Sequence, residues 1–353
     1  MRRLTKIAAA SAVLSIALTA CANDSNNGAA EDLCSGDGDG PNVGLAYDVG
    51  GRGDQSFNDA AARGMEKAKE ELGATCTEAQ AQDGEPESAR EDRLRTLAED
   101  GHDPIIGTGF AYSLAVDAVA PDFPDTSFGV VDGFDPTADD ANDNVAYLGF
   151  AEHEGSFLVG VAAALKTETD HVGFVGGVHN DLIKKFEAGY VAGVEAINPD
   201  ITVDVTYIEE EDLSGFADPA GGKAAAAAMY ENGADIVYHA SGGSGSGVFD
   251  AAVEAGDGMW AIGVDSDQYL TASDDQKEHI LTSMLKRVDT ATFNEIQSVA
   301  DDKPLSSYQS YDLAADGVGY STSGGYIDDI TDQIDEWAEK IKSGEVEVPS
   351  TVE

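Results

Sequence analysis

Short apolar runs alternate with longer amphipathic stretches through most of the chain. A short apolar run bounded by turn residues is typical of a buried parallel strand, whereas a longer stretch with caps and an apolar stripe is typical of a helix. On this pattern we expect strands at 43–47, 104–106, 128–131, 145–150, 172–175, 201–207, 235–239 and 260–264, and a further strand that Cys76 opens. We expect helices at 58–72, 86–99, 154–165, 182–197, 219–231 and 247–255.

This alternation predicts an α/β protein made of β-α-β units, in which helices cover both faces of a doubly wound parallel sheet. Ten or more expected strands are too many for one such sheet, so we expect two. One break lies near Phe150, because the polar loop 134–144 replaces a helix between two strands. Another lies at Asp265, before the polar segment 266–279, and the tail adds a strand at 307–313 and a helix at 325–341.

These breaks predict an N-terminal lobe of residues 41–150 plus 265–305 and a C-terminal lobe of residues 151–264 plus 306–353. Strands that end at a lobe boundary direct their carboxyl ends into the space between the sheets. Ligands of open α/β sheets bind in that place, so we expect the functional site between the lobes.

Charge restricts the partners of the protein. The 353 residues include 67 acidic and 20 basic side chains, which gives a formal net charge of -47 at pH 7. Such a field repels polyphosphate and argues against a nucleic-acid partner. The same excess keeps the surface hydrated and is typical of a salt-rich or solubility-demanding setting.

The first twenty residues have the order of an export signal. A basic start is followed by an apolar run at 7–17, which is too short to span a bilayer, and then by Leu18, Thr19 and Ala20 directly before Cys21. This order predicts a lipoprotein signal peptide at 1–20 and a lipid anchor on Cys21 at the extracytoplasmic face of the cell membrane. The alternative is an ordinary secretory signal with a Cys there by chance. Residues 21–40 are polar and acidic, and we expect them to form a flexible tether.

Two further cysteines, Cys34 and Cys76, remain in the chain. In an exported protein such a pair favours a disulfide over a metal site, since no cluster of soft ligands accompanies it. Cys34 precedes the first expected strand and Cys76 opens the second, and neighbouring parallel strands would bring the two together. The alternative is two free buried thiols.

The sequence offers little for catalysis. No Ser in the Gly-rich segment 242–247 has both glycines of a G-x-S-x-G elbow, and neither a P-loop nor a dinucleotide-binding G-x-G-x-x-G occurs. The six histidines lack the i, i+4 spacing of a helical metal pair. We therefore expect no enzyme activity, no metal and no cofactor.

The loop after the first strand is the segment that points to a binding site. It reads D-V-G-G-R-G-D-Q-S-F-N over residues 48–58, so that glycines, two carboxylates, an aromatic ring and a helix start lie close together. Carboxylates suit vicinal hydroxyls and the ring suits a planar group. A Gly-rich turn with an Asn cap is the alternative interpretation.

This loop resembles the D-x-G-G-x-x-D-x-S-F-N signature of the basic membrane protein family, the purine nucleoside receptor A-like lipoproteins. The resemblance continues, in order and spacing, through about residue 320. Its further segments are 109–110 with 120–122, 128–132, 154–160, 173–177, 239–249, 263–269 and 282–286. The resemblance implies a type I periplasmic-binding-protein fold, with two lobes joined by three crossing segments, that binds a nucleoside and passes it to an ABC permease and its ATPase.

Residue by residue, the resemblance implies ligand contacts from the N-terminal lobe. Asp48 and Asn58 match first-loop positions that contact the ligand, and Phe57 matches an aromatic on one face of the base. Asp132 matches a carboxylate that faces the cleft and the base edge. A helix cap is the alternative role for Asp132.

The C-terminal part supplies the other implied contacts. Phe216 resembles the second aromatic, although the inserted Gly215 departs from the family pattern and Phe216 could instead be ordinary core. Gly243 matches a backbone contact, and Asp265 and Lys286 match a pair that binds ribose hydroxyls.

The leading hypothesis is therefore a lipid-anchored, monomeric nucleoside receptor of an ABC importer, with purines favoured. Stacking of a base on an aromatic ring and charge-assisted bonds from diols to carboxylates support it, and a phosphate would meet charges of its own sign. Alternatives are a sugar or signal-molecule receptor on the same fold, a sensor or adhesin, and a nucleoside hydrolase or phosphorylase. An enzyme of the last kind would need a metal-binding Asp cluster or a phosphate site.

Overall fold

The computed structural model describes residues 33–133 and 142–352. The expected signal peptide, Cys21 and the first part of the expected tether lie outside the described residues. None of the helices within the described ranges is both long and apolar enough to cross a membrane.

The N-terminal lobe is built on a six-stranded sheet whose paired strands are all parallel. The strand order is β11-β5-β4-β3-β1-β2. The strands are β1 (Asn42–Tyr47), β2 (Thr75–Gln80), β3 (Ile105–Thr108), β4 (Phe128–Val131), β5 (Val145–Phe150) and β11 (Ser307–Tyr311). Every residue of β3, β4 and β5 is buried and most are apolar, as expected for strands with helices on both faces.

The C-terminal lobe repeats this plan. Its six strands have the order β12-β10-β9-β8-β6-β7, and the terminal β12 is antiparallel to β10 while the other pairs are parallel. The strands are β6 (His171–Val178), β7 (Thr202–Glu209), β8 (Ile236–Ala240), β9 (Trp260–Asp265), β10 (Ile280–Lys286) and β12 (Val318–Tyr320). The expected α/β fold with two doubly wound sheets is confirmed.

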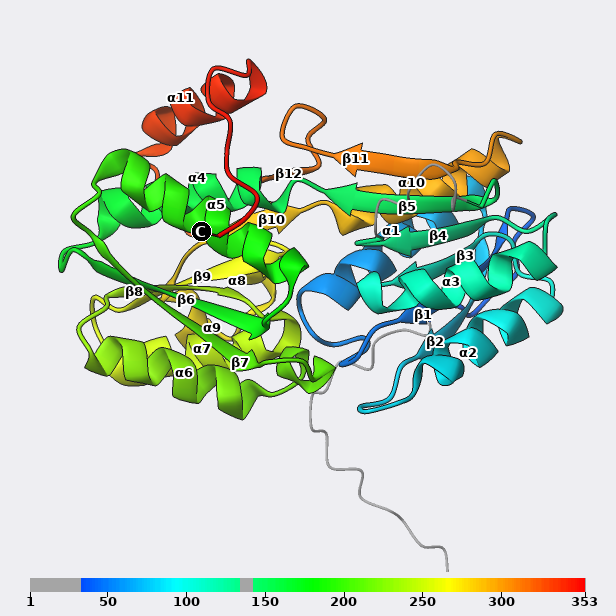
Figure 1. Cartoon of the computed structure of the whole chain (residues 1–353), viewed down its shortest axis with the longest axis horizontal. Coiled ribbons are helices and arrows are strands. Elements are labelled where there is room, and N and C mark those ends of the chain that lie inside the picture. Colours follow the sequence, from blue (N-terminus) through cyan, green and yellow to red (C-terminus); the bar gives the residue numbers. More distant parts are fainter. Residues whose placement is uncertain (1–32, 134–141, 353) are drawn as a thin grey trace, which may run out of the picture. The chain divides into compact units, whose positions relative to one another are not determined.

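Pairs of helices cover both faces of each sheet. In the N-terminal lobe α1 packs with α10 and α2 with α3, and in the C-terminal lobe α4 packs with α5 and α6 with α7. Figure 1 shows the α4–α5 pair and the α6–α7 pair on opposite faces of the second sheet. The helices are α1 (Phe57–Leu72), α2 (Glu87–Glu99), α3 (Ser113–Val119), α4 (Glu152–Lys166), α5 (Asp181–Ile197), α6 (Pro219–Glu231), α7 (Gly245–Ala255), α8 (Gln268–Thr271), α9 (Asp274–Lys277), α10 (Val288–Ala300) and α11 (Thr331–Lys342).

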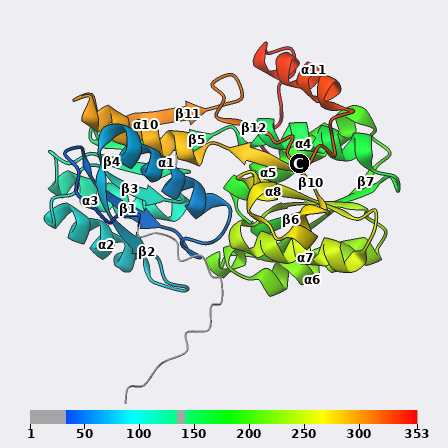
Figure 2. The same cartoon turned by 180° about the vertical axis from the view of Figure 1, so that it is seen from behind.

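The chain passes between the sheets at three places: from β5 to α4, from β10 to α10 and from β11 to β12. Two of these crossings touch, because the rings of Phe150 and Tyr311 stack with centroids 5.2 Å apart. Figure 2, seen from behind, shows β10 and β5 leading toward the same junction. Three crossings agree with the number that the family resemblance implies.

The division between the lobes differs from the expected boundaries of 265–305 and 306–353. Segment 266–279 was expected to leave the C-terminal lobe, but it forms α8 and α9 and leads into β10 of the same sheet. Only after Lys286 does the chain cross, so that α10 packs on α1 and β11 pairs with β5 in the N-terminal lobe. Segment 266–279 is the short connection from β9 to β10. The sequence did not reveal it, because short exposed helices have little apolar pattern.

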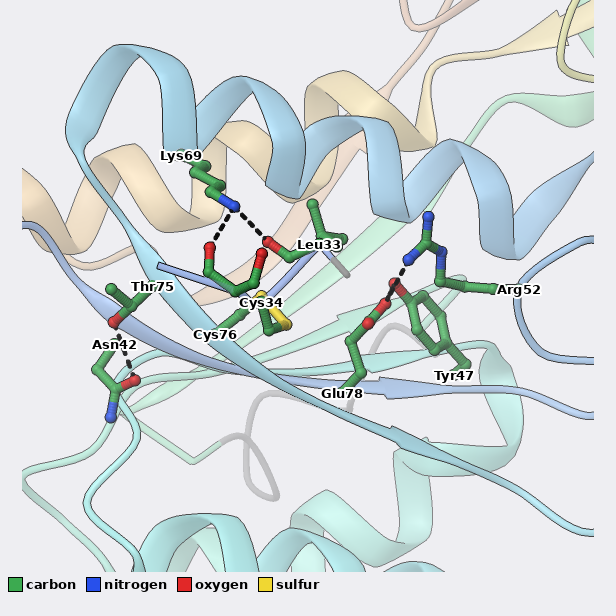
Figure 3. The surroundings of a disulfide bond; sticks show 10 residues. Leu33, Cys34, Asn42, Tyr47, Arg52, Lys69, Thr75, Cys76 and Glu78 are labelled. Carbon is green, nitrogen blue, oxygen red and sulfur yellow. Dashed lines mark hydrogen bonds and ion pairs between the residues drawn. A yellow bond between two sulfur atoms is a disulfide. The ribbon is translucent and has the colours of Figure 1, made fainter. Parts of the chain in front are cut away.

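The predicted disulfide between Cys34 and Cys76 is present. It joins the segment before β1 to the first residues of β2, as Figure 3 shows. Lys69 of α1 holds the same segment, because its Nζ donates to the carbonyl oxygens of Leu33 at 2.8 Å and Ser35 at 2.6 Å. The start of the described chain is thus fixed at the amino-terminal ends of β1 and β2.

Candidate ligand-binding site between the two sheets

A cavity lies at the carboxyl ends of the strands of both sheets, the place where ligands of open α/β sheets bind. Its lining includes all eight residues predicted to bind ligand. They are Asp48, Phe57, Asn58, Asp132, Phe216, Gly243, Asp265 and Lys286, and the other lining residues are Val49, Asp54, Gly109, Phe110, Leu182, Ile183, Phe186, Ala240, Gly242 and Val264.

The Gly-rich loop after β1 is held by its own polar side chains. Asp54 accepts hydrogen bonds from the backbone N–H groups of Ser56, Asn58 and Asp59 at 2.8 to 3.1 Å, so it caps the start of α1. Asn58 accepts from the N–H of Asp48 at 3.0 Å and donates to Asp54 at 3.1 Å. Most of the Asn58 amide is therefore committed to holding the loop.

Aromatic rings reach the cavity from both lobes. Phe57 begins α1 in the N-terminal lobe, and Phe216 ends a short 3-10 helix, η3 (Leu213–Phe216), in the C-terminal lobe. The Phe216 ring lies against Gly177, where a Cβ atom would come within 2.5 Å of it. Phe110 and Phe186 line the cavity as well. The cavity therefore has apolar walls on either side of the interlobe gap.

A buried ion cluster lies at one end of the cavity. The Nζ atom of Lys286 is 2.8 Å from Asp132 Oδ2 and 3.5 Å from Asp265 Oδ1, and the three side chains are only 3 to 7% exposed. Burial alone would lower the pKa of Lys286, but the charges of Asp132 and Asp265 outweigh it and raise that pKa. The ammonium also lies 4.7 Å from the centre of the Phe57 ring.

The pairing in this cluster adds a detail to the expected roles. Both oxygens of Asp132 accept hydrogen bonds from Lys286, at 2.8 and 3.0 Å. The Lys286 ammonium is therefore bonded more closely to Asp132 than to Asp265, the residue with which the family pattern groups it for binding ribose hydroxyls. Burial raises the pKa of Asp132, and the Lys286 ammonium opposes that rise.

Asp265 retains unused hydrogen-bonding capacity. Its Oδ2 accepts from the hydroxyl of Ser56 at 2.9 Å, across the interlobe gap. Its Oδ1 is buried and has no hydrogen-bond partner within the described ranges. An acceptor of this kind costs free energy unless a donor reaches it, so a ligand hydroxyl would satisfy it.

Two more carboxyl groups of the cavity titrate near neutrality. Burial raises the pKa of Asp48 to about 6, against the hydrogen bond from the Val49 N–H and the charge of Arg90. Burial likewise raises the pKa of Asp54 to about 6, against the hydrogen bonds that it accepts from the loop. A ligand that donates hydrogen bonds to these groups would favour their charged forms.

Gly243 belongs to η4 (Gly242–Ser244), the turn that leads into α7. A Cβ atom at this position would lie 3.3 Å from the Phe216 carbonyl oxygen and 3.6 Å from Asp54 Cβ. The tighter of these two contacts is with Phe216 of the same lobe, and the distance to Asp54 is an ordinary van der Waals contact.

Metal chemistry has no visible ligand set here. Within residues 33–133 and 142–352, no three or more His, Cys, Asp or Glu side chains are grouped so that they could hold a metal ion. The cluster of Asp132, Asp265 and Lys286 is instead neutralised in part by its own ammonium.

Residues 42–352 match the family described as "ABC transporter substrate-binding protein PnrA-like". The chain belongs to this family. Its members are substrate-binding components of ABC transporters, and the resemblance identified from the sequence is confirmed.

Relatives of the PnrA-like chain match over most of its length. The CD4+ T-cell-stimulating antigen of Listeria monocytogenes is 36% identical, covering 87% of each chain. The ABC transporter nucleoside-binding protein BmpA of Lactococcus lactis is 32% identical, covering 87% of this chain and 88% of its own. A solute-binding protein of an ABC transporter system from Aeropyrum pernix has a similar structure, with a TM-score of 0.75, 27% identity and coverage of 89% and 94%.

Several lining residues of this PnrA-like protein were not predicted. Asp54 lay inside the recognised loop, and only the structure shows that it accepts hydrogen bonds from the first backbone N–H groups of α1. Leu182, Ile183 and Phe186 come from the first turns of α5, where an ordinary apolar helix face gives no sign that a ligand cavity adjoins it.

Proposed function

We propose that this protein is a lipid-anchored, extracytoplasmic receptor that binds purine nucleosides between its lobes and delivers them to an ABC permease. The observation that carries the proposal is the arrangement of the cavity. Aromatic rings enter it from both lobes, and at one end a buried carboxylate oxygen of Asp265 lies 3.5 Å from the Lys286 ammonium without a hydrogen bond in the described part of the chain. A ligand that is flat at one end and hydroxylated at the other fits both features.

The aromatic walls support a planar base. Stacking of a base on an aromatic side chain contributes about 1 to 3 kcal/mol per base. Because Phe57 and Phe216 belong to different lobes, a base that contacts both rings would stabilise the arrangement in which the lobes meet. Binding and closure would then be coupled.

The charges of the cavity support a neutral ligand. Among the described residues that line it, Lys286 is the only Lys or Arg, and two carboxylates already lie beside it. Asp48 and Asp54 add further negative charge when ionised. A 5′-phosphate would meet this excess, so nucleosides should bind more tightly than nucleotides.

Anchoring and delivery rest on the sequence and the family. The proposed lipid attachment to Cys21 follows from the signal-like order of residues 1–20. The chain belongs to a family of ABC transporter substrate-binding proteins, and one relative is named as nucleoside-binding. We expect a monomer, which sedimentation of the purified protein would test, and Cys21→Ala should abolish palmitate labelling and release the protein from the membrane fraction.

A thermal-shift screen followed by calorimetry tests the ligand. Inosine, guanosine and adenosine should raise the melting temperature, because a ligand that binds the folded state stabilises it by mass action. Free ribose and nucleoside 5′-monophosphates serve as comparisons. A shift with ribose alone would instead support a sugar receptor, and no shift with any nucleoside would contradict the proposal.

The same sample tests catalysis. Inosine incubated with the protein should be recovered intact by chromatography, because a receptor releases its ligand unchanged. Release of free hypoxanthine well above the rate in buffer would show a hydrolase instead.

A further inference from the structure

Strands β8 and β9 separate before they reach the cavity. Their last paired residues are Tyr238 and Ile262, and no ladder pairing between these strands follows in the described part of the chain. The backbone N–H of Val264 therefore needs a partner other than β8, and Val264 directly precedes the carboxylate of Asp265.

Gln268 supplies this partner. Its Oε1 accepts from the Val264 N–H at 2.8 Å and lies 3.0 Å from His239 Nε2. Because a backbone N–H can only donate, the atom that faces it is the amide oxygen, and His239 must carry its proton on Nε2. Nδ1 of His239 then accepts from the Ser241 hydroxyl at 3.2 Å. Burial lowers the pKa of His239 to about 4, so the ring stays neutral at physiological pH.

His239 and Gln268 are closely packed by the residues around them. His239 is fully buried and Gln268 is 2% exposed. A Cβ atom at Gly245 would lie 1.9 Å from Cε1 of His239, and one at Gly263 would lie 2.7 Å from Oε1 of Gln268. Glycine at both positions lets the two polar side chains approach the backbone closely.

The turn that the pair holds is conformationally unusual. Asp265 has a φ of 63°, in the left-handed region that non-glycine residues seldom adopt. From the other lobe, Ser56 donates to Oδ2 of Asp265 at 2.9 Å. Oδ1 lies 3.5 Å from the Lys286 ammonium and has no hydrogen bond in the described part of the chain, so it is the oxygen open to a ligand donor.

We propose that His239 and Gln268 are positioning residues, which hold the Val264–Asp265 turn so that Oδ1 of Asp265 receives a hydroxyl of the ligand. The inference rests on the proposed function, in which the sugar hydroxyls of a nucleoside bind Asp265. His239 orients the Gln268 oxygen, and that oxygen fixes the backbone one residue before the carboxylate. Neither side chain contacts the ligand.

The test compares inosine with 2′,3′-dideoxyinosine, which lacks the two hydroxyls. The wild-type protein should bind inosine at least tenfold more tightly, since hydrogen bonds to charged groups are among the stronger ones. Gln268→Met keeps the volume but removes the acceptor, and His239→Leu removes the donor that orients it. Both variants should reduce the preference for inosine to about threefold or less. His239→Gln, which retains an N–H donor, should restore most of the preference.

Tyr230→Phe is the matched control. It removes another hydrogen bond to the backbone of β9, the partly buried bond from Tyr230 Oη to the Trp260 carbonyl at 2.8 Å, at the far end of the strand. This variant should lose stability and keep the wild-type preference for inosine. A preference within twofold of wild type in Gln268→Met would show a merely structural role and overturn the proposal.

A second readout does not depend on nucleoside binding. In Gln268→Met, exchange of the Val264 amide proton measured by NMR should accelerate at least tenfold, while the Trp260 amide stays protected. Unchanged exchange at Val264 would overturn the inference even if the wild-type protein bound no nucleoside. If the wild-type protein bound no nucleoside but exchange at Val264 accelerated in Gln268→Met, only the proposed ligand would be contradicted. The role of His239 and Gln268 in holding the turn would still be supported.

Discussion

Asp132 and Asp265 occupy matching positions in the two lobes and share one ammonium group. Asp132 follows β4 and Asp265 ends β9, and each of these strands is the fourth from the β2 or β7 edge of its sheet. Their φ angles of 59° and 63° are alike, and the Nζ atom of Lys286 lies within 3.5 Å of both carboxylates. Because Lys286 belongs to the C-terminal lobe, separation of the lobes would break its bond to Asp132.

The first prediction concerns the stability of this cluster. Lys286→Met leaves two buried carboxylates without their cation, and breaking a buried ion pair in this way costs about 3 to 5 kcal/mol. We expect the free energy of unfolding, measured in urea at pH 7, to fall by that amount. Asp132→Asn in the same chain should restore part of it, because one uncompensated charge is then removed.

Lys223 offers a comparison for that experiment. It pairs with Glu254 at 2.7 Å on the surface, where ion pairs contribute little. Lys223→Met should leave unfolding unchanged within error. Equal losses for the two lysine variants would contradict the view that burial makes the Lys286 cluster important.

The second prediction concerns the aromatic walls. Phe57→Ala, Phe216→Ala and Asp265→Ala should each weaken binding of guanosine or adenosine at least tenfold, which corresponds to about 1.4 kcal/mol. Calorimetry with the purified protein measures this directly. Phe57 and Phe216 are half-buried at the cavity wall, so we expect both variants to fold.

Phe123 is the control for these variants. It is a half-buried ring of the N-terminal lobe that packs beside Arg95, outside the lining of the cavity. Phe123→Ala should keep the wild-type affinity. Wild-type affinity in the Phe57 and Asp265 variants as well would refute the assigned site.

Much of the fold could be predicted because its central strands are buried on both faces. Strands such as β4 and β5 read as uninterrupted apolar runs, and the helices between them carry clear apolar stripes. Strand β10 was missed because Thr282, Ser283 and Lys286 interrupt its pattern. Two of these residues support the site: Ser283 accepts from the Gln268 N–H, and Lys286 bonds to Asp132.

The candidate site was predictable only in part, for a related reason. Local motifs such as the loop 48–58 gave the positions that line the cavity, and the family resemblance gave the residues that lie far apart in the chain. Neither the motifs nor the family resemblance could predict which of these side chains contact one another. The bond of Lys286 to Asp132 and the support of the Asp265 turn by His239 depend on how two lobes meet and how two strands diverge.

The third prediction concerns the Cys34–Cys76 disulfide, which closes a loop with a sequence separation of 42. Constraint of the unfolded chain by a loop of this length corresponds to about 4 kcal/mol, and typical measured values are about 2 to 4 kcal/mol. The double variant Cys34→Ser with Cys76→Ser should lose stability in this range in urea unfolding. Ligand affinity should not change, because the disulfide lies at the opposite end of β1 from Asp48. A large loss of affinity in the folded variant would show that the two ends of the sheet are coupled.

The last prediction concerns pH and Glu295, a fully buried residue of α10. Its side chain lies under β4, where a Cβ atom at Gly129 would be 3.1 Å from its Cγ, and neither of its oxygens has a hydrogen-bond partner in the described part of the chain. Burial, with a smaller contribution from the charge of Asp103, raises the pKa of Glu295 to about 8. In the unfolded chain the same group ionises near its ordinary value of about 4.3. The folded state therefore loses relative stability as the pH rises from that value to about 8, where the folded protein must also ionise the group.

Glu295→Gln removes this dependence and keeps the shape of the side chain. We expect the variant to gain stability over the wild type with rising pH, by about 4 kcal/mol between pH 5 and pH 9, as each unit of pKa difference corresponds to about 1.4 kcal/mol. Urea unfolding at pH 5, 7 and 9 measures the difference between the two proteins, so that contributions from other carboxyl groups cancel. Glu336→Gln, at an exposed position on α11, is the control for the loss of one carboxyl charge. A stability difference for Glu295→Gln that stays constant from pH 5 to pH 9 would mean that Glu295 ionises at the same pH in the folded and unfolded chains.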